Sequence, residues 1–307
     1  MLTQTPMLTE AQINDYNEVG AIVVPNVLSI AEMVELRRVT DMFVEKSRAV
    51  TAHNDIFDLE DTHTPAQPRL RRIKAPHLHD PAYAALMRHP GIVGALASLW
   101  GPNIRFDTAK LNLKSANFGA AVEWHQDWAF YPHSNDDLAA VGVMMDDMGE
   151  ENGPLMIIPG SHKGPVVFDH HSDGKFCGAM DPTKKEVDYS KAISLTGKAG
   201  SISIHHVRAV HGSAVNTSNQ DRRLLLFQFR AADAWPFMAT PKNLDAWDAL
   251  MVAGEPTLAP RLTAVPVRLP WPIADLQGSI YENQKGLTNR YFAIPEALKP
   301  KVPQPAK

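Results

Sequence analysis

The sequence of 307 residues has little cysteine, no surplus of positive charge and no long apolar run. Its single cysteine, Cys177, excludes an internal disulfide framework and is typical of proteins of the reducing cytosol. Lys and Arg number 30 against 34 Asp and Glu, so a net charge of -4 offers no basic surface for nucleic acid or an anionic membrane. No apolar run approaches the length that crosses a bilayer, and residues 1–6 lack the pattern of a secretory signal. We therefore expect a cytoplasmic protein that binds neither nucleic acid nor membrane.

The pattern of helical and strand signals changes once along the chain, near residue 103. Before that point, capping boxes that begin at Thr9 and Ser29 each precede an apolar-periodic run, which indicates helices. After it, short strand patterns alternate with turn residues, which is typical of an antiparallel jelly roll of the cupin-like class. The predicted fold class is therefore mainly β with flanking helices. We expect one domain, 1–307, with mostly helical N-terminal support (1–102), a jelly-roll core (103–230) and a C-terminal extension (231–307).

A candidate metal site lies in the predicted strand Ala120–Phe130. His125 and Asp127 are two residues apart, so in a strand their side chains share one face and can bind one metal ion. A second His from a distant strand would complete the 2-His-1-carboxylate set of non-haem Fe(II) oxygenases. His211, between the strand pattern 200–204 and a polar turn, is the best candidate for that ligand. From the pattern alone, His211 fits a plain strand-end residue equally well.

The spacing His-x-Asp is not specific by itself, because the chain contains two further examples. His53 with Asp55 and His171 with Asp173 both lie in polar, turn-like surroundings, where solvated loop residues are the simpler interpretation. Only His125 is flanked by aromatic residues on both sides and followed by a plausible third ligand.

Several motifs follow one another in order along residues 8 to about 230. They are the opening Leu8–Leu28, the helix ending Leu99–Asn103, Trp124–Asp127, Glu151–Leu155 leading to Ile158–His162, and His211–Ser213. In this order they resemble the phytanoyl-CoA dioxygenase family of Fe(II)- and 2-oxoglutarate-dependent oxygenases. The resemblance implies a double-stranded β-helix core in which His125, Asp127 and His211 hold the iron and act as the catalytic centre.

The same resemblance implies residues for the cosubstrate, 2-oxoglutarate. In the family, an arginine binds its far carboxylate through two parallel charge-assisted hydrogen bonds. Arg222, eleven residues after His211, matches the position of that arginine. Ser213 matches a family position that contacts the same carboxylate, and Lys110 matches a position that lines the cosubstrate pocket. Strand alternation separates Arg222 from Arg223 only weakly, so Arg223 stays a second candidate.

One residue departs from the family pattern. Many relatives carry a Trp where this chain has Gly142, on the strand before the Glu-Asn-Gly loop. A glycine there either widens the pocket or leaves space that Trp128 fills.

The expected activity is oxidation, most simply hydroxylation, of a small organic substrate by O₂ and 2-oxoglutarate, with release of succinate and CO₂. Asp127 as a carboxylate ligand argues against a halogenase, which needs that position vacant for chloride. Two other classes fit the residues: a redox-inert metal hydrolase, and a cupin-like binding protein without turnover. The hydrolase would leave Arg222 and Ser213 without a purpose.

Two polar segments, 50–70 and 169–191, have no strong helix or strand pattern. We predict that they close over the substrate, because oxidation of this kind needs a dry site and specificity often lies in loops around a barrel mouth.

Overall fold

The protein is described by a computed structural model that covers residues 7–238, 241–269, 272–276 and 278–292. The larger sheet contains β1 (Ala21–Val24), β2 (Phe57–Leu59), β3 (Leu70–Lys74), β4 (Ile104–Lys114), β6 (Leu138–Met144), β11 (Ile202–His206), β13 (Arg222–Ala231) and β14 (Met251–Ala253). The smaller sheet contains β5 (Val122–His125), β7 (Leu155–Ile157), β10 (Ile193–Leu195) and β12 (His211–Ser213). A separate two-stranded sheet consists of β8 (His171–Ser172) and β9 (Lys175–Phe176). The helices are α1 (Glu10–Val19), α2 (Ile30–Lys46), α3 (Pro81–Leu86), α4 (Pro90–Trp100), α5 (Leu244–Asp248) and α6 (Ile280–Asn283).

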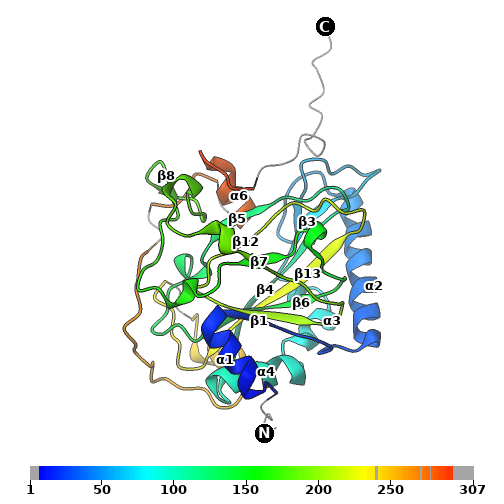
Figure 1. Cartoon of the computed structure of the whole chain (residues 1–307). Coiled ribbons are helices and arrows are strands. Elements are labelled where there is room, and N and C mark those ends of the chain that lie inside the picture. Colours follow the sequence, from blue (N-terminus) through cyan, green and yellow to red (C-terminus); the bar gives the residue numbers. More distant parts are fainter. Residues whose placement is uncertain (1–6, 239–240, 270–271, 277, 293–307) are drawn as a thin grey trace.

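The two main sheets are antiparallel and face each other across the interior of the protein (Figure 1). The larger sheet has the order β1-β11-β6-β13-β4-β3-β2, with β14 also on β4, and the smaller has the order β10-β7-β12-β5. From β4 to β7 and again from β10 to β13, consecutive strands alternate between the two sheets, as in a jelly roll. The predicted class, mainly β with flanking helices around a jelly-roll core, is confirmed.

The N-terminal helices begin where the sequence predicts. In α1 the Thr9 side chain accepts a hydrogen bond from the backbone N–H of Gln12 at 3.2 Å, and in α2 Ser29 does the same for Glu32 at 3.3 Å. Each capping box satisfies N–H groups that have no partner inside the helix. The helical pattern before Gly101 is divided into α3 and α4, and α4 begins at Pro90, which the first turn of a helix tolerates.

The largest hydrophobic core lies between the outer face of the larger sheet and the helices. Along β13, every second side chain faces this core, among them Leu225, Phe227 and Phe229, which are at most 1% exposed. They pack with α2 and α4 residues such as Val39 and Ile92. The intervening residues of β13 face the space between the sheets, where the site lies. In Figure 1, α2 runs alongside the edge of the sandwich.

Two local predictions differ from the structure. The polar segment 50–70 shows no strong strand pattern in the sequence, but β2 lies within it, and β2 and β3 extend the larger sheet beyond β4. Its polar residues are accommodated because buried ion pairs, such as Arg72 with Asp58, neutralise them. The strand predicted over Ala120–Phe130 ends at His125, and residues 127–129 form a 3₁₀ turn.

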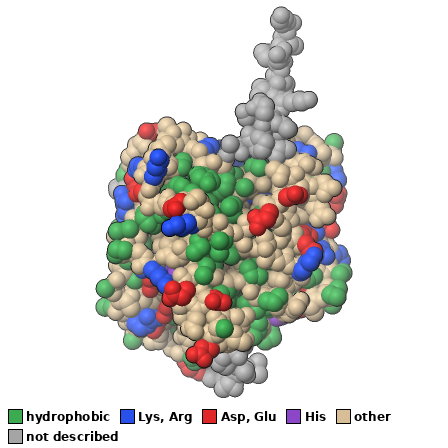
Figure 2. All heavy atoms as spheres, viewed as in Figure 1, with side chains coloured by type: hydrophobic (Ala, Val, Ile, Leu, Met, Phe, Trp, Pro, Cys, Tyr) green, Lys and Arg blue, Asp and Glu red, His purple; other side chains and the backbone are tan. Residues whose placement is uncertain are grey.

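The described part of the C-terminal extension returns to the jelly roll. β14 pairs with the start of β4, and α6 places Tyr281 against the cavity between the sheets. Residues 293–307 of the predicted extension lie outside the described residues. Among the described helices, none combines the length and apolar character that a membrane span requires. On the face shown in Figure 2, Lys and Arg side chains are interspersed with Asp and Glu.

Candidate metal and cosubstrate site

Two histidines lie side by side on neighbouring strands of the smaller sheet. His125 ends β5 and His211 begins β12, and the antiparallel register places them directly opposite each other, with ring centroids 4.1 Å apart. Each Nδ1 lies beside a backbone carbonyl, that of Glu123 at 2.8 Å and that of Ala209 at 2.9 Å. A carbonyl only accepts hydrogen bonds, so Nδ1 carries the proton in both rings. The Nε2 lone pairs are therefore free for a metal ion.

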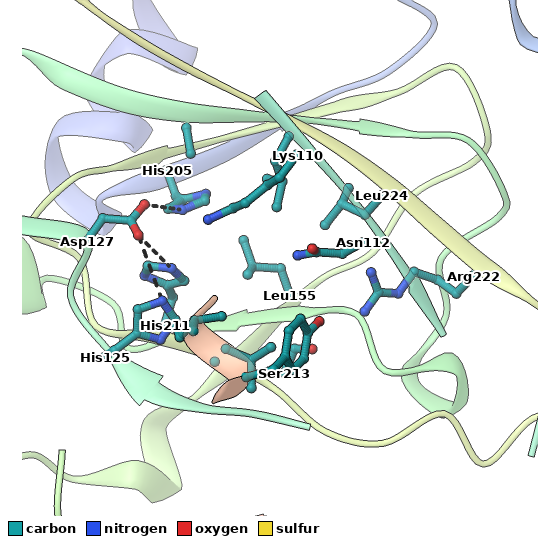
Figure 3. A pocket seen from close by; sticks show the side chains of 16 residues that line it. Lys110, Asn112, His125, Asp127, Leu155, His205, His211, Ser213, Arg222 and Leu224 are labelled. Atoms are coloured by element: carbon teal, nitrogen blue, oxygen red, sulfur yellow. Dashed lines mark ion pairs between the residues drawn. The ribbon is translucent and has the colours of Figure 1, made fainter. Parts of the chain in front are cut away.

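Asp127 completes the cluster from the 3₁₀ turn that follows β5. Its Oδ1 lies 3.8 Å from His125 Nε2 and 4.0 Å from His211 Nε2, and ligand atoms of all three residues lie within 4.8 Å of one another (Figure 3). All three side chains are buried. The atoms are too far apart to hydrogen-bond to one another but close enough to share one ion. Two imidazoles and one carboxylate fit Fe(II) as a non-haem oxygenase binds it.

The second oxygen of Asp127 has its own neighbours, which the sequence did not single out. Oδ2 lies 3.8 Å from His205 Nε2 and 3.5 Å from Gln228 Nε2. The neighbouring His206 turns to the other side, toward Tyr16 and away from the cluster. An adjacent pair of histidines carries no local signal for which one faces the interior, so only the pairing of β11 with β6 selects His205.

Burial sets the protonation states that a metal site needs. Removal from water lowers the pKa of His125 to about 4 and that of His211 well below its ordinary value. Burial alone would raise the pKa of Asp127, but the neighbouring His205 and the charge of Lys110 outweigh it, and the pKa lies well below its usual range. At neutral pH the cluster therefore presents neutral imidazoles and an ionised carboxylate, the forms that bind metals.

A cavity extends from the cluster between the sheets, and Arg222 lies at its far side (Figure 3). Arg222 is 2% exposed; one Nη donates to Gly153 O at 2.8 Å, while Nε and the other Nη find no partner among the described residues. Burial lowers its pKa to about 10, so it remains charged at neutral pH. Unpartnered N–H donors on a buried guanidinium are suited to binding a carboxylate.

Arg223 lies on the opposite face of β13 and is already paired. It holds Asp146 at 2.9 Å and 2.7 Å and Asp41 at 2.9 Å, outside the cavity. Between the two arginines that the sequence left open, the structure brings only Arg222 to the metal cluster's cavity.

The other predicted cosubstrate residues also border this cavity. Ser213 accepts a hydrogen bond from the buried ammonium of Lys114, which also donates to the carbonyl of Ala214. Lys110 reaches the cavity from the metal end, with its ammonium near His205 and Asp127 (Figure 3). Sequence reasoning missed Lys114 and Tyr281, because neither lies near a motif. The remaining lining residues include Asn112, Val122, Leu155, Leu224 and Leu226.

Gly142 leaves no open space in the cavity wall. A Cβ at this position would lie 2.7 Å from Ser203 Oγ and 2.9 Å from Leu224 Cδ1. Trp128 points elsewhere and donates to Pro266 O at 2.6 Å. The leucines of β13 therefore occupy the space that a larger residue would need, and neither alternative expected from the sequence applies.

The segment 169–191 is hydrogen-bonded to β5 and to the residue that follows it. The Gln126 N–H donates to His170 Nε2 at 2.8 Å, and the Met180 N–H donates to Trp124 O at 2.8 Å. Phe176 from the same segment lines a neighbouring cavity. Closure of this segment over a substrate stays a prediction, but part of it also supports the site.

The jelly roll and the buried His–Asp–His cluster define a non-haem metal oxygenase of the double-stranded β-helix type. A family model for phytanoyl-CoA dioxygenase (PhyH) matches residues 16–224, and the chain belongs to this family. The resemblance seen in the sequence is thereby confirmed.

Curated relatives carry the same class of activity in their names. The chain is 36% identical over 290 residues to a probable alpha-ketoglutarate-dependent hypophosphite dioxygenase of Stutzerimonas stutzeri, covering 93% of this chain and 100% of that protein. It is 29% identical over 255 residues to an L-proline trans-4-hydroxylase of Streptomyces griseoviridis, covering 77% of this chain and 91% of that one.

Solved structures support the fold. EctD from S. alaskensis with bound Fe superposes with a TM-score of 0.63 at 22% identity, over 86% of this chain and 90% of that one. The family and the relatives confirm a 2-oxoglutarate-dependent non-haem iron dioxygenase with Fe(II) and 2-oxoglutarate as its cofactor and cosubstrate. The hydrolase and the binding protein without turnover are set aside.

Proposed function

We propose that His125, Asp127 and His211 hold the Fe(II) ion, and that the adjoining cavity holds 2-oxoglutarate with its far carboxylate on Arg222. Bound there, Fe(II) supplies the site at which O₂ and 2-oxoglutarate react to oxidise the substrate, with release of succinate and CO₂. The observation that carries this proposal is that two buried nitrogens of Arg222, in the cavity that begins at the metal cluster, have no partner among the described residues.

The other residues of the cavity have supporting roles in this proposal. Ser213, held by Lys114, adds a hydroxyl beside Arg222 for the same carboxylate. Lys110 lies at the metal end and contacts the cosubstrate near its keto-acid group. His205 and Gln228 hold Oδ2 of Asp127, so that Oδ1 stays directed at the two histidines. Partners of this kind commonly orient a metal's ligands.

The substrate is a small molecule, and its identity is part of the proposal. The sequence led us to expect an organic substrate and insertion of one oxygen atom into a C–H bond. The relative named as a probable hypophosphite dioxygenase acts on a small inorganic anion with P–H bonds, and the proline hydroxylase acts on an amino acid. Hypophosphite and L-proline are therefore the first two compounds to test.

The test of the proposal is spectroscopic and then chemical. Anaerobic Fe(II) and 2-oxoglutarate should together give the weak visible charge-transfer band of a chelated 2-oxo acid, and neither should give it alone. On admission of air, succinate should form in step with product for the true substrate. A protein that binds Fe(II) but gives no band with 2-oxoglutarate would contradict the proposed cosubstrate cavity.

We also propose a single oxygenase domain in the cytoplasm that binds no nucleic acid. The C-terminal extension supports the domain assignment, since α6 contributes Tyr281 to the cavity. The location is supported by the one cysteine, Cys177, which is buried and free.

A further inference from the structure

A second cavity adjoins the metal cluster and shares only Lys110, Asp127 and Ile280 with the cosubstrate cavity. Its uncharged lining residues include polar ones, such as Gln228 and Tyr131. The apolar side chains that line it are those of Phe130, Phe176, Ile273 and Ala274. A compound in this cavity would touch Asp127, one of the proposed iron ligands, while 2-oxoglutarate occupied the first cavity.

The charged groups that line the second cavity are mostly positive. Arg72, Lys74 and Lys110 project into it from neighbouring strands, where Lys74 pairs with Lys110 in the register of β3 and β4. Asp127 is the only acidic residue among the described residues that line it. Three cations therefore face one carboxylate, and that carboxylate belongs to the metal cluster.

A single buried carboxylate behind the cavity compensates two of these cations. Asp58 lies 2.9 Å from Arg72 Nε and 3.0 Å from Lys74 Nζ. Burial of Asp58 favours its neutral form, but attraction by Arg72 and Lys74 outweighs this and lowers its pKa. One negative charge thus serves two positive ones. Lys110 makes no ion pair or hydrogen bond with any described residue.

When iron and 2-oxoglutarate are bound, part of the positive charge of Arg72, Lys74 and Lys110 stays uncompensated. If the proposed function holds, the charges of Fe(II), Asp127, 2-oxoglutarate and Arg222 cancel, because the two carboxylates of the cosubstrate meet the metal and the guanidinium. Lys110 and the Arg72–Lys74–Asp58 group then retain two positive charges beside the second cavity. Enclosed charge without a counter-ion is costly, and a bound anion removes that cost.

We propose that the substrate of this enzyme is a small anion and that Lys110, with the Arg72–Lys74 pair, binds its negative group in the second cavity. The inference rests on the proposed function and adds the substrate's charge to it. An ammonium has three donors, so Lys110 can contact both the cosubstrate and a substrate anion. The amide of Gln228, which donates to the Tyr131 hydroxyl and lies 3.5 Å from Asp127 Oδ2, marks where the anion meets the metal side of the cavity.

The first measurement needs no variant. The anaerobic Fe(II)–2-oxoglutarate complex, saturated with 2-oxoglutarate, is titrated with hypophosphite, with acetate and with acetamide, which has the shape of acetate without its charge. We expect both anions to shift the charge-transfer band. Acetamide should need at least about a tenfold higher concentration than acetate to produce a half-maximal shift, because it lacks the charge-assisted contact. The inference would be overturned if acetate and acetamide shifted the band at equal concentrations. Loss of the band through displacement of 2-oxoglutarate would overturn it as well.

Two lysine variants locate the charge. Lys110→Met should weaken the binding of both anions about tenfold and leave the binding of acetamide nearly unchanged. The preference for a charged ligand is then largely lost. Lys114→Met removes a buried lysine from the same strand at the Arg222 end, and should change the affinity for 2-oxoglutarate while keeping the preference for anions. An intact preference in Lys110→Met refutes the assignment. Absence of the band in the wild type would instead contradict the proposed function.

Discussion

The two faces of the larger sheet use the same strands for different purposes. On the outer face of β13, Leu225, Phe227 and Phe229 are buried among helices and contribute hydrophobic stability. On the inner face, Arg222 and Gln228 are also buried, but they face the cavities and the metal cluster. Burial alone therefore does not separate core from site. At the start of β13, the unpartnered nitrogens of Arg222 mark the side of the site, since buried polar atoms without partners are uncommon in a well-packed core.

The arginine pair at the start of β13 shows this contrast within two residues. Arg223 is bound to Asp146 and Asp41, as a residue outside the site should be. Arg222 donates to Gly153 O, and two of its nitrogens have no partner in the part of the chain that the structure describes. The following changes test whether the inner face serves function and the outer face stability.

The largest effect is expected from Asp127→Ala on the inner face. Loss of the only carboxylate in the cluster should abolish both the charge-transfer band and succinate formation, because two histidines alone bind Fe(II) weakly. Asp146→Ala is the matched change on the outer side, and it should retain the band. Equal loss in both variants would break the distinction between the faces.

A large effect on stability is expected from Phe227→Ala on the outer face. This side chain is fully buried beside Phe106 and Phe229, and its removal should lower the free energy of unfolding by about 3–5 kcal/mol. Denaturant titration measures the loss, and turnover per folded molecule should be little changed at low temperature. A variant as stable as the wild type would show that the outer core is not what holds the sheet.

Arg222→Ala should raise the KM for 2-oxoglutarate roughly ten- to a hundredfold, since a charge-assisted contact contributes about 1.5–3 kcal/mol. Arg223→Ala should change this KM much less and act mainly on stability. Steady-state kinetics at varied 2-oxoglutarate distinguishes them. The reverse ranking would place the cosubstrate on the other arginine.

The smallest effect that we expect is on the pH dependence of stability, through His170 in the segment 169–191. Burial lowers the pKa of His170 to about 3, and its neutral ring accepts the Gln126 N–H. The unfolded chain binds this proton below pH 6.5 while the folded protein resists it, so stability should fall as pH decreases from about 6.5 toward 3. The slope from this group is at most about 1.4 kcal/mol per pH unit. In His170→Gln the slope in denaturant titrations should be smaller, and an unchanged slope would exclude this histidine as the source.

Local sequence signals predicted the N-terminal helices and the change to strands after residue 103, and missed what depends on distant partners. The capping boxes at Thr9 and Ser29 act within four residues, so the sequence contains all their parts. By contrast, the sequence does not predict β2 and β3, because Asp58 and Arg72 look like surface charges until they pair across fourteen residues. The early end of β5 was missed for a similar reason, since aromatic residues continue the strand pattern beyond His125.

The sequence by itself determined the fold class, the family and the cofactors, because ordered motifs and strand patterns are properties of neighbouring residues. Only the tertiary structure decided which arginine faces the cavity, which histidine joins Asp127, and which cations share Asp58. Each of these depends on strand register and on side chains from distant parts of the chain, such as His205 beside Asp127 and Tyr281 beside Arg222. A one-residue change of register exchanges the two faces of a strand, and no local pattern in β13 was strong enough to exclude it.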